Sequence, residues 1–277
     1  MKELLTRAAE NAQIGAIGFV RARIFSELTE RLEGENTPMT PPAEERINPF
    51  LLMETAKTVI VCLFPFKKGV RTNISDYAKG DDYHITVRAG LETLCEILRG
   101  AGFAATALCD SSPLCERHLA YLAGLGFVGR NRALISPEFG SYVFIGTILT
   151  DAEIEPDKPL ATGCGGCNAC VRACPGGALS AGFDAARCAS YLTQKKGGLT
   201  AEERAIIKRS GYAWGCDICQ RVCPHNAQVA YDAGADFCLR ADMAESNRDF
   251  RRKYVGRAFS WRGFEVIKRN LEILKSE

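Results

Sequence analysis

The sequence has no long uncharged hydrophobic run. No stretch of its 277 residues approaches the roughly 18 consecutive apolar residues that predict a membrane-spanning helix. The N-terminal segment, MKELLTRAAENAQIGAIGFV, carries charged side chains among its apolar ones, which indicates an amphipathic helix rather than a signal peptide. These absences predict a cytoplasmic chain without a membrane segment.

A strong net charge and a disulfide framework are absent as well. The formal net charge is +2 and the sequence pI is about 7.9, so the overall charge does not require a polyanionic partner. The chain has 13 cysteines, an odd number that is clustered rather than spread, which argues against the disulfide scaffold of a secreted protein. We expect these thiols to be reduced and available to metals.

The first part of the chain predicts an α/β layer domain over residues 1–154, because strands alternate with helices there. Ser112 is a candidate N-cap and Pro113 a candidate first residue for one of these helices. The predicted segments are helices at 1–13, 82–102 and 112–126, strands at 57–66 and 103–110, a hairpin over 132–150 with its turn at 136–140, and a loop over 33–49.

The composition changes near residue 155. Residues 155–230 are rich in Cys and Gly and have few long apolar runs, so something other than hydrophobic burial must hold them together. Residues 231–277 have a helical pattern, and within them residues 240–277 hold ten Lys and Arg against six Asp and Glu, a net charge of +4. We therefore predict three parts, with boundaries at 154/155 and 230/231.

The run GCGGCNACVRACPGGAL has the cysteine spacing of a bacterial ferredoxin. In the pattern C-x2-C-x2-C-x3-C-P, three thiolates hold one 4Fe–4S cluster and the fourth ligates a neighbouring cluster. A second run, GCDICQRVCPHN, lacks the first cysteine of its triplet, and Cys188 is the natural replacement. The predicted ligands are Cys164, Cys167, Cys170 and Cys223 for the first cluster, and Cys174, Cys188, Cys216 and Cys219 for the second.

Zinc is the alternative metal for these thiols. Zinc sites commonly use pairs of C-x2-C with four ligands each, whereas a triplet followed by x3-C-P, nearly repeated, is typical of iron–sulfur proteins. The remaining cysteines are predicted to be buried small apolar side chains. They are Cys62, Cys95, Cys109, Cys115 and Cys238.

Two clusters in series form a path for electrons, and the long segment before them is expected to hold the electron acceptor. Several segments outside and around the cysteines resemble the epoxyqueuosine reductase family, whose members modify tRNA. These segments are ISDYAKGDDYH (74–84), CDSSPLCERHLAYLAGLGFVGRN (109–131), GSYVFIGTILTD (140–151), CGGCNACVRACPGGAL (164–179), RCASYLTQKKGG (187–198) and GCDICQRVCPHN (215–226).

The resemblance implies a cobalamin bound base-off between the α/β domain and the double 4Fe–4S domain, a fold shared with the reductive dehalogenases. It implies that the clusters deliver electrons to this cofactor, and that epoxyqueuosine in tRNA is deoxygenated to queuosine. The expected partners are tRNA and an external electron donor such as flavodoxin or ferredoxin, and the expected state is a monomer.

The resemblance also implies roles for particular residues. Asp110 matches the family's proton donor, while the residues alone leave open that it caps the following helix. The positions that match segments lining the cobalamin, or that follow Cys188 directly, are Gly129, Arg130, Asn131, Ser141, Tyr142, Ser190, Tyr191 and Thr193. Neither His84, His118 nor His225 stands in the context of an axial cobalt ligand, which agrees with a base-off cofactor.

Two departures separate this sequence from the longer family members. It lacks their C-terminal helical-repeat extension, and His225-Asn226 stands where Trp-Asn is common. The alternative functions are therefore a corrinoid reductase of another substrate and an iron–sulfur electron carrier without catalysis. A basic segment beside the clusters is predicted to be solvated surface, with phosphate contact as the alternative; it contains Lys195, Lys196, Arg204, Lys208 and Arg209.

Overall fold

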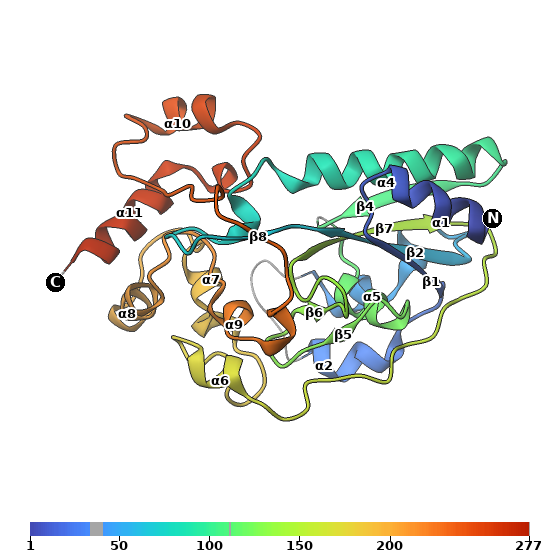
Figure 1. The fold of residues 1–277 in the computed structure, drawn as a ribbon, viewed down its shortest axis with the longest axis horizontal. Coiled ribbons are helices and arrows are strands. Elements are labelled where there is room, and N and C mark those ends of the chain that lie inside the picture. Colours follow the sequence, from blue (N-terminus) through green and yellow to red (C-terminus); the bar gives the residue numbers. More distant parts are fainter. Residues whose placement is uncertain (34–40, 111, 277) are drawn as a thin grey trace. The chain divides into compact units, whose positions relative to one another are not determined.

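The computed structural model describes residues 1–33, 41–110 and 112–276 (Figure 1). The chain forms two compact units. The first comprises residues 1–66, 84–129 and 133–163, and the second comprises residues 67–83, 130–132 and 164–277. This division differs from the predicted boundaries, because the segment 67–83 joins the cluster region and the C-terminal tail is part of the same unit.

The first unit contains a four-stranded sheet in the order β1-β2-β7-β4. Its strands are β1 (Ala16–Arg21), β2 (Thr58–Pro65), β4 (Ala105–Cys109) and β7 (Val143–Thr150). All three pairings are antiparallel, and Val61 of β2 lies opposite Gly18 on one side and Thr147 on the other. The alternation of strands and helices correctly predicted a sheet layer covered by helices. The strands of this sheet pair in antiparallel fashion.

Helices cover both faces of this sheet. Alternate residues of β2, including Val59 and Val61, pack in the same core as Leu119 of α5 (Glu116–Leu122). On the opposite face the long helix α4 (Tyr83–Gly100) approaches closely, since a Cβ on Gly146 would lie 2.8 Å from Leu91. The continuous apolar run of β2 follows from burial on both faces.

Several predicted elements have other bounds. The N-terminal helix α1 is Lys2–Asn11. The predicted loop 33–49 contains the short helix α3 (Ala43–Ile47), follows α2 (Thr29–Glu33), and lies partly outside the described residues. Helix α5 begins at Glu116 with Cys115 as its N-cap, so Ser112 and Pro113 do not start it.

The predicted hairpin over 132–150 is wrong in its pairing. The turn is present, since Ser136 and Gly140 exchange backbone hydrogen bonds of 2.8 and 3.0 Å. However, β6 (Leu134–Ile135) pairs with β5 (Phe127–Val128), whereas β7 enters the main sheet between β2 and β4. Burial in the main sheet has outweighed the local pairing that proximity in sequence favoured.

The second unit is mostly helical. Two short strands, β3 (Lys68–Gly69) and β8 (Tyr231–Asp232), pair in parallel, and Ile74 forms a parallel bridge with Trp214. The helices are α6 (Ala169–Ala173), α7 (Ala189–Leu192), α8 (Ala201–Ser210), α9 (Ile218–Arg221), α10 (Asn247–Tyr254) and α11 (Phe264–Lys275).

The C-terminal tail supplies the hydrophobic core of the second unit. Trp214, Phe250 and Phe259 are fully buried in one cluster, together with Ile267 of α11. A smaller cluster joins Leu192 and Ile207 to Ile273. The cysteine-rich region therefore shares an ordinary apolar core with the tail, to which it contributes Trp214, Leu192 and Ile207. Within the described ranges no helix is long and apolar enough to cross a membrane.

Candidate iron–sulfur centres and the Asp110 loop

The eight predicted ligand cysteines form two groups in the second unit. Burial raises the pKa of the Cys223 thiol, and the nearby thiols of Cys164, Cys170 and Cys167 raise it further. Cys223 is thus close to the first run although it belongs to the second run in sequence. This proximity agrees with the crossed ligand set, which stays a prediction.

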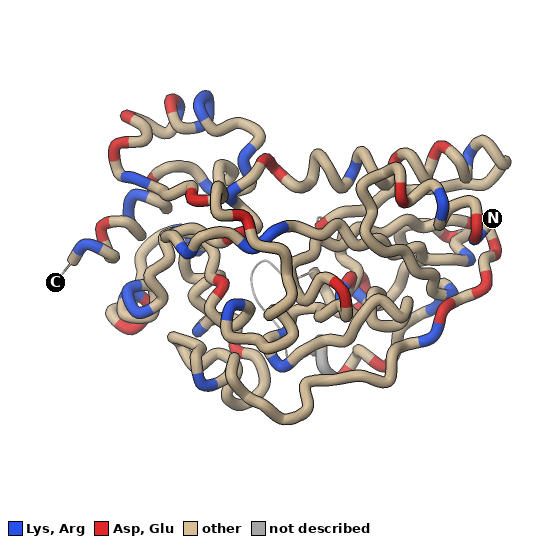
Figure 2. The backbone as a smooth tube through the Cα atoms, viewed as in Figure 1, with Lys and Arg blue, Asp and Glu red and all other residues tan. Residues whose placement is uncertain are grey.

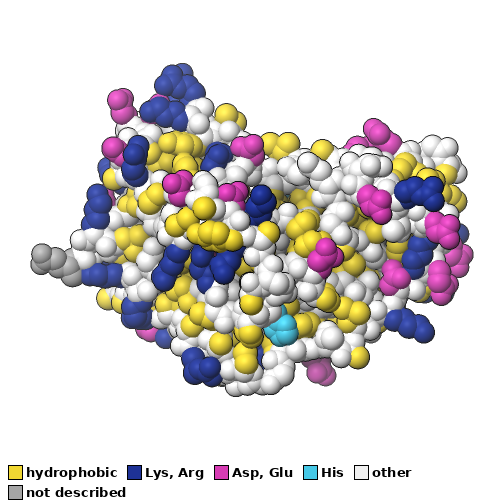
Figure 3. Space-filling view, viewed as in Figure 1, with side chains coloured by type: hydrophobic (Ala, Val, Ile, Leu, Met, Phe, Trp, Pro, Cys, Tyr) yellow, Lys and Arg dark blue, Asp and Glu magenta, His cyan; other side chains and the backbone are white. Residues whose placement is uncertain are grey.

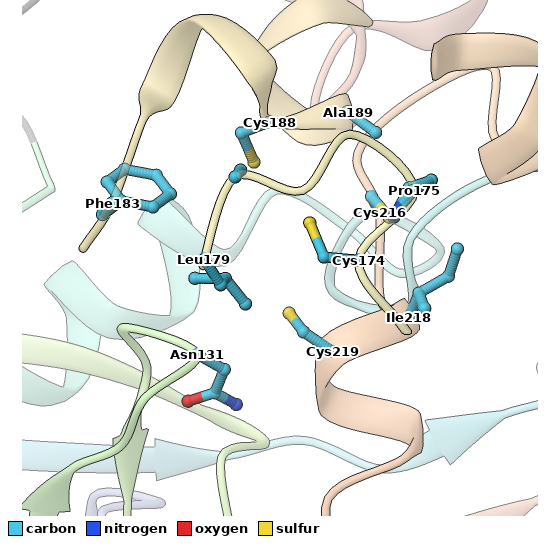
Figure 4. Close-up of a pocket in the computed structure, with 11 residues that line it drawn as sticks. Asn131, Cys174, Pro175, Leu179, Phe183, Cys188, Ala189, Cys216, Ile218 and Cys219 are labelled. Carbon is cyan, nitrogen blue, oxygen red and sulfur yellow. The ribbon is translucent and has the colours of Figure 1, made fainter. Parts of the chain in front are cut away.

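The second group lies around a partly open pocket. Burial raises the pKa of the Cys219 thiol, and Cys216, Cys188 and Cys174 add to this rise. In Figure 4 the sulfur atoms of Cys174, Cys188 and Cys219 point into the same space. The pocket has a volume of about 390 Å³, and its other walls come from Asn131, Pro175, Ala178, Leu179, Phe183, Ala189 and Ile218.

These residues fit a 4Fe–4S cluster by their chemistry. Four thiols in one apolar pocket offer the soft ligands that iron–sulfur clusters use. The raised pKa values describe thiols without metal, and coordination would hold the same groups as thiolates.

The backbone of the second group is tied closely together. A Cβ on Gly176 would lie 1.9 Å from the carbonyl oxygen of Arg187, so only glycine permits this approach. The amide of Asn270 on α11 donates to the carbonyl oxygens of Thr193 (2.7 Å) and Ala213 (2.9 Å). These bonds hold the segments that carry Cys188 and Cys216 in place.

The segment 130–132 lies against both cysteine groups. The backbone N–H of Arg130 donates to the sulfur of Cys164 over 3.3 Å, and its guanidinium donates to the side chain of Asn168. Its neighbour Asn131 lines the pocket of the second group (Figure 4). Two residues that the sequence placed beside a cofactor are thus beside the cluster ligands, where N–H donors to sulfur influence a cluster's potential.

The other residues predicted at the cofactor have varied surroundings. In the first unit, Tyr142 is fully buried against Phe66, with ring centroids 5.4 Å apart, and Ser141 is buried beside it. Gly129 is buried and donates from its backbone to Ala133. In the second unit, the hydroxyl of buried Thr193 donates to Ser190 and accepts from Gly215, while Ser190 and Tyr191 are half-buried.

Asp110 directly follows β4 and has an unusual backbone conformation. Its φ of +53° lies in the left-handed region, which is uncommon for residues other than glycine. Its side chain is 62% exposed, and its carboxylate lies 3.4 Å from Nε2 of His84 on α4. Because the N-cap of α5 is Cys115, Asp110 does not cap that helix.

Glu116 is a second carboxyl group beside Asp110. Its Oε1 accepts the backbone N–H of Asp110 over 3.0 Å. Burial and the charge of Asp110 raise the pKa of Glu116 to about 8. From the sequence, His84 was considered only as an axial cobalt ligand and Glu116 was not considered, although both fall within the segments DDYH and CDSSPLCER that carry the family resemblance.

A buried charge network in the second unit was also missed. Asp76 pairs with Lys79 over 2.7 Å and with Arg221, and all three side chains are largely buried. Asp217, which adjoins Cys216, accepts hydrogen bonds from the backbone of Asp76 and the hydroxyl of Ser75. The network anchors the segment 67–83 to the helix that carries Cys219.

The five other cysteines differ in how deeply they are buried. Cys62, Cys95 and Cys109 are buried, as predicted, and Cys115 is half-buried. Cys238 is exposed, and its thiol donates to Asn73, so its predicted burial is wrong.

The basic segment near the clusters makes several internal contacts. Lys195 pairs with Glu203, Arg209 donates to the carbonyl oxygen of Pro175, and Lys208 donates to that of Ser276. Three of its predicted surface cations therefore already have partners in the unit.

On the first unit, His118 is 13% exposed and pairs with Glu27 over 3.0 Å.

Two family models match the chain. The 4Fe-4S double cluster binding domain matches residues 163–226, and the model described as epoxyqueuosine reductase QueG, DUF1730, matches residues 46–111. The first match supports iron–sulfur clusters over zinc at the cysteines.

Curated relatives cover nearly the whole chain. Epoxyqueuosine reductase of Lactococcus garvieae is 36% identical over 98% of this chain and 85% of its own length, and that of Bacillus cereus is 34% identical over 98% and 78%. Epoxyqueuosine reductase of Cellulophaga algicola is 29% identical, and the match covers 96% of each chain. That relative is therefore similar in length to this chain.

Solved structures agree with these relatives. Epoxyqueuosine reductase from Streptococcus thermophilus superimposes with a TM-score of 0.90 at 32% identity, over 99% of this chain and 80% of the other. A structure of epoxyqueuosine reductase with an epoxyqueuosine-modified tRNA-Tyr stem loop has a TM-score of 0.89 at the same identity and coverage. The Bacillus subtilis enzyme, with its aspartate catalytic loop swung out of the active site, has a TM-score of 0.86 at 32% identity, over 99% and 80%.

A reductive dehalogenase shares the fold alone. Its TM-score is 0.52 at 18% identity, over 82% of this chain and 32% of the other. The fold class predicted from the sequence, a dehalogenase-like domain with a double 4Fe–4S domain, is thereby confirmed.

Proposed function

The chain belongs to the epoxyqueuosine reductase family, and we propose that its site reduces epoxyqueuosine in tRNA to queuosine with Asp110 as the proton donor. The observation that carries the proposal is the combination of two thiol groups, each fit for a 4Fe–4S cluster, with nearly full-length similarity to epoxyqueuosine reductases. The solved complex of one such enzyme with a modified tRNA stem loop supports tRNA as the substrate.

The reaction consumes two electrons and two protons. Both C–O bonds of the epoxide break, a carbon–carbon double bond forms, and the oxygen leaves as water. The electrons come through the two clusters from an external donor such as flavodoxin or ferredoxin. The protein's own contribution is to bind the substrate, exclude competing reactions and deliver protons at the departing oxygen.

Asp110 is the proposed source of one proton. It lies beside His84, whose Nε2 is 3.4 Å from the carboxylate, so an exchangeable proton is within reach of the acid. Glu116 holds the backbone of Asp110 from the other side. The Bacillus subtilis enzyme, in which an aspartate catalytic loop swings out of the active site, supports the same role for this aspartate.

Residues 129–131 are of types that could contact a bound cobalamin. Asn131 lines the pocket of the second thiol group, so a group held by this segment would lie beside an electron source. We propose that Gly129, Arg130, Asn131, Ser141, Tyr142, Ser190, Tyr191 and Thr193 contact the cofactor. When bound, cobalamin supplies a strongly reducing, nucleophilic metal for the deoxygenation.

The remaining proposals concern the setting of the enzyme. We propose a cytoplasmic monomer, because the cluster thiols must stay reduced and the substrate is tRNA. Epoxyqueuosine reductase of Cellulophaga algicola, which matches over 96% of each chain, supports epoxyqueuosine as the substrate.

The test of the proposed function is turnover. Anaerobically purified protein with reconstituted clusters and cobalamin is incubated with reductant and with tRNA from cells blocked at the epoxide step. Nucleosides are then analysed by mass spectrometry. Queuosine is the expected product, and unchanged epoxyqueuosine with fully loaded protein would overturn the proposal.

A further inference from the structure

The most basic part of the chain lies outside the cysteine groups. Residues 248–262 hold six Lys and Arg side chains and one Asp, a formal net charge of +5. Figure 2 shows these cations on α10 and on the chain that follows it, and in the space-filling view they gather over the same helix (Figure 3). This is a local excess on a protein whose total net charge is only +2.

Two of these cations lack a partner within the described part of the chain. Asp249 pairs with Arg252 over 3.0 Å and with Lys253 over 2.9 Å, and so neutralises part of the helix. Arg248 and Arg251 are exposed, and among the residues that the structure describes neither makes an ion pair or a side-chain hydrogen bond. They differ in this from Lys195, Lys208 and Arg209, whose charges are engaged within the unit.

Arg248 and Arg251 border a hollow with an aromatic neighbour. Arg248, Arg251 and Arg262 line an open hollow of about 650 Å³ together with Asn247, Gly263 and Glu265. The adjacent Trp261 is 54% exposed, and the guanidinium of Arg262 lies over its indole ring, 3.8 Å from the centroid. An exposed indole beside arginines is a suitable surface for stacking a nucleobase.

The hollow is rigidly supported. Phe250 of α10 is fully buried and stacks on Phe264, with ring centroids 5.2 Å apart. The side-chain oxygen of Asn247 accepts the backbone N–H of Phe264 over 2.6 Å. Because α10 and the start of α11 are joined in this way, the backbone that carries the arginines is held in place.

We propose that this surface, formed by Arg248, Arg251, Trp261 and Arg262, binds the phosphate backbone and an unpaired base of the tRNA substrate. The inference rests on the proposed function, since it names where that substrate is held. Planar guanidinium groups suit bidentate contact with phosphate oxygens, and an exposed indole suits a nucleobase better than it suits an acidic protein surface.

The test measures binding of a fluorescently labelled, unmodified anticodon stem-loop RNA to the fully loaded protein at several salt concentrations. The double variant Arg248→Gln/Arg251→Gln should raise the Kd about tenfold or more and lower the slope of log K against log salt by about 1 to 2, because two phosphate contacts are lost. Trp261→Ala should raise the Kd about fivefold or more with an unchanged salt slope.

A matched control removes the same charge elsewhere. Arg7 and Arg21 are exposed on the first unit, and Arg7→Gln/Arg21→Gln should leave the Kd and the salt slope near those of the wild type. Iron content and the thermal midpoint of each variant report on folding, and they should be unchanged because the altered side chains are on the surface.

The outcomes separate this proposal from the proposed function. If Arg248→Gln/Arg251→Gln binds the RNA like the wild type, the patch is not the RNA surface, even when the wild type produces queuosine. If that variant binds RNA normally but is reduced more slowly by flavodoxin, the patch docks the electron donor and the proposal is wrong. If the wild type binds RNA through the patch but forms no queuosine, the proposed function is wrong and the RNA-binding surface is still supported.

Discussion

The backbone N–H of Asp110 donates a 3.0 Å hydrogen bond to Oε1 of Glu116. This bond closes the turn between β4 and α5, where Asp110 has a φ of +53°. It leaves the carboxylate of Asp110 directed toward His84 rather than toward the first turn of the helix. Glu116, the first residue of α5, therefore supports the position of Asp110, although Asp110 does not cap that helix.

Replacing Asp110 by asparagine should abolish chemistry without disturbing the fold. Asparagine tolerates the left-handed backbone conformation and keeps the size of the side chain, but it cannot donate the proton of an acid. Asp110→Asn should bind cobalamin and retain its clusters, while single-turnover conversion of epoxyqueuosine falls about a hundredfold or more.

The control is a change of the same chemistry at an exposed site. Asp236 is exposed in the second unit, and Asp236→Asn should convert the substrate at the wild-type rate. A wild-type rate for Asp110→Asn would remove Asp110 from the role of proton donor.

Glu116 should make the stability of the protein depend on pH. Its pKa of about 8 in the folded state lies above the ordinary carboxyl value of 4.5, so the folded state favours the protonated form. The stability from this group is fully present below about pH 4.5 and is lost as the pH rises to about 8. Glu116→Gln keeps the acceptor for Asp110 but cannot ionise, so its thermal midpoint should gain on the wild type between pH 5 and pH 9.

Glu27 provides a control of opposite sign. Its hydrogen bond with Arg23, together with that of His118, lowers its pKa to about 2. Its stabilising contribution is present above the ordinary pKa and is lost as the pH falls toward 2. Glu27→Gln should lower the thermal midpoint at pH 7, and less so at pH 3. Parallel pH profiles for Glu116→Gln and the wild type would contradict the raised pKa of Glu116.

The cluster ligands could be predicted from the sequence because most of them are separated by only two or three residues. The ferredoxin pattern identifies these cysteines as ligands, and Cys188 could be found as the one that the second run lacks. Asp110 was found by its family context, but its neighbours His84 and Glu116 were not, because their approach depends on how α4 and α5 cover the sheet.

Other features depend on contacts that are distant in sequence. The segment 67–83 joins the second unit because Ile74 pairs with Trp214 and Asp76 pairs with Arg221, and no local pattern encodes these pairings. The late start of α5 arises because Cys115, not Ser112, precedes its first turn. The sequence predicted the tail as a separate part, yet its aromatic side chains pack in one core with Trp214 of the cluster region.

Asn270 should be essential for the stability of the second cluster. Its amide is fully buried and donates to two backbone carbonyls, which would be left without this donor in Asn270→Leu. A loss on the order of 2 kcal/mol or more in unfolding free energy is expected. Chemical denaturation and iron analysis measure the effect, and Lys268→Leu, at an exposed position of the same helix, is the control. Equal stability and iron content in the two variants would contradict the role of Asn270.

Paired cysteine variants should distinguish crossed from sequential ligation. If Cys223 completes the first cluster, Cys164→Ala/Cys223→Ala removes one cluster and leaves about four irons per chain. Cys219→Ala/Cys223→Ala should then remove both clusters. Sequential ligation predicts the reverse for the two variants, so iron and sulfide analysis after anaerobic reconstitution decides between them. Cys238→Ala should keep about eight irons, because that thiol belongs to neither group.

The most direct test of the account is conversion of epoxyqueuosine in tRNA by the anaerobically reconstituted protein, followed by mass spectrometry of the nucleosides. The account predicts queuosine, formed only with reductant and cobalamin and strongly reduced by Asp110→Asn. Unchanged epoxyqueuosine, from protein that holds both clusters and cobalamin and binds the tRNA, would contradict it.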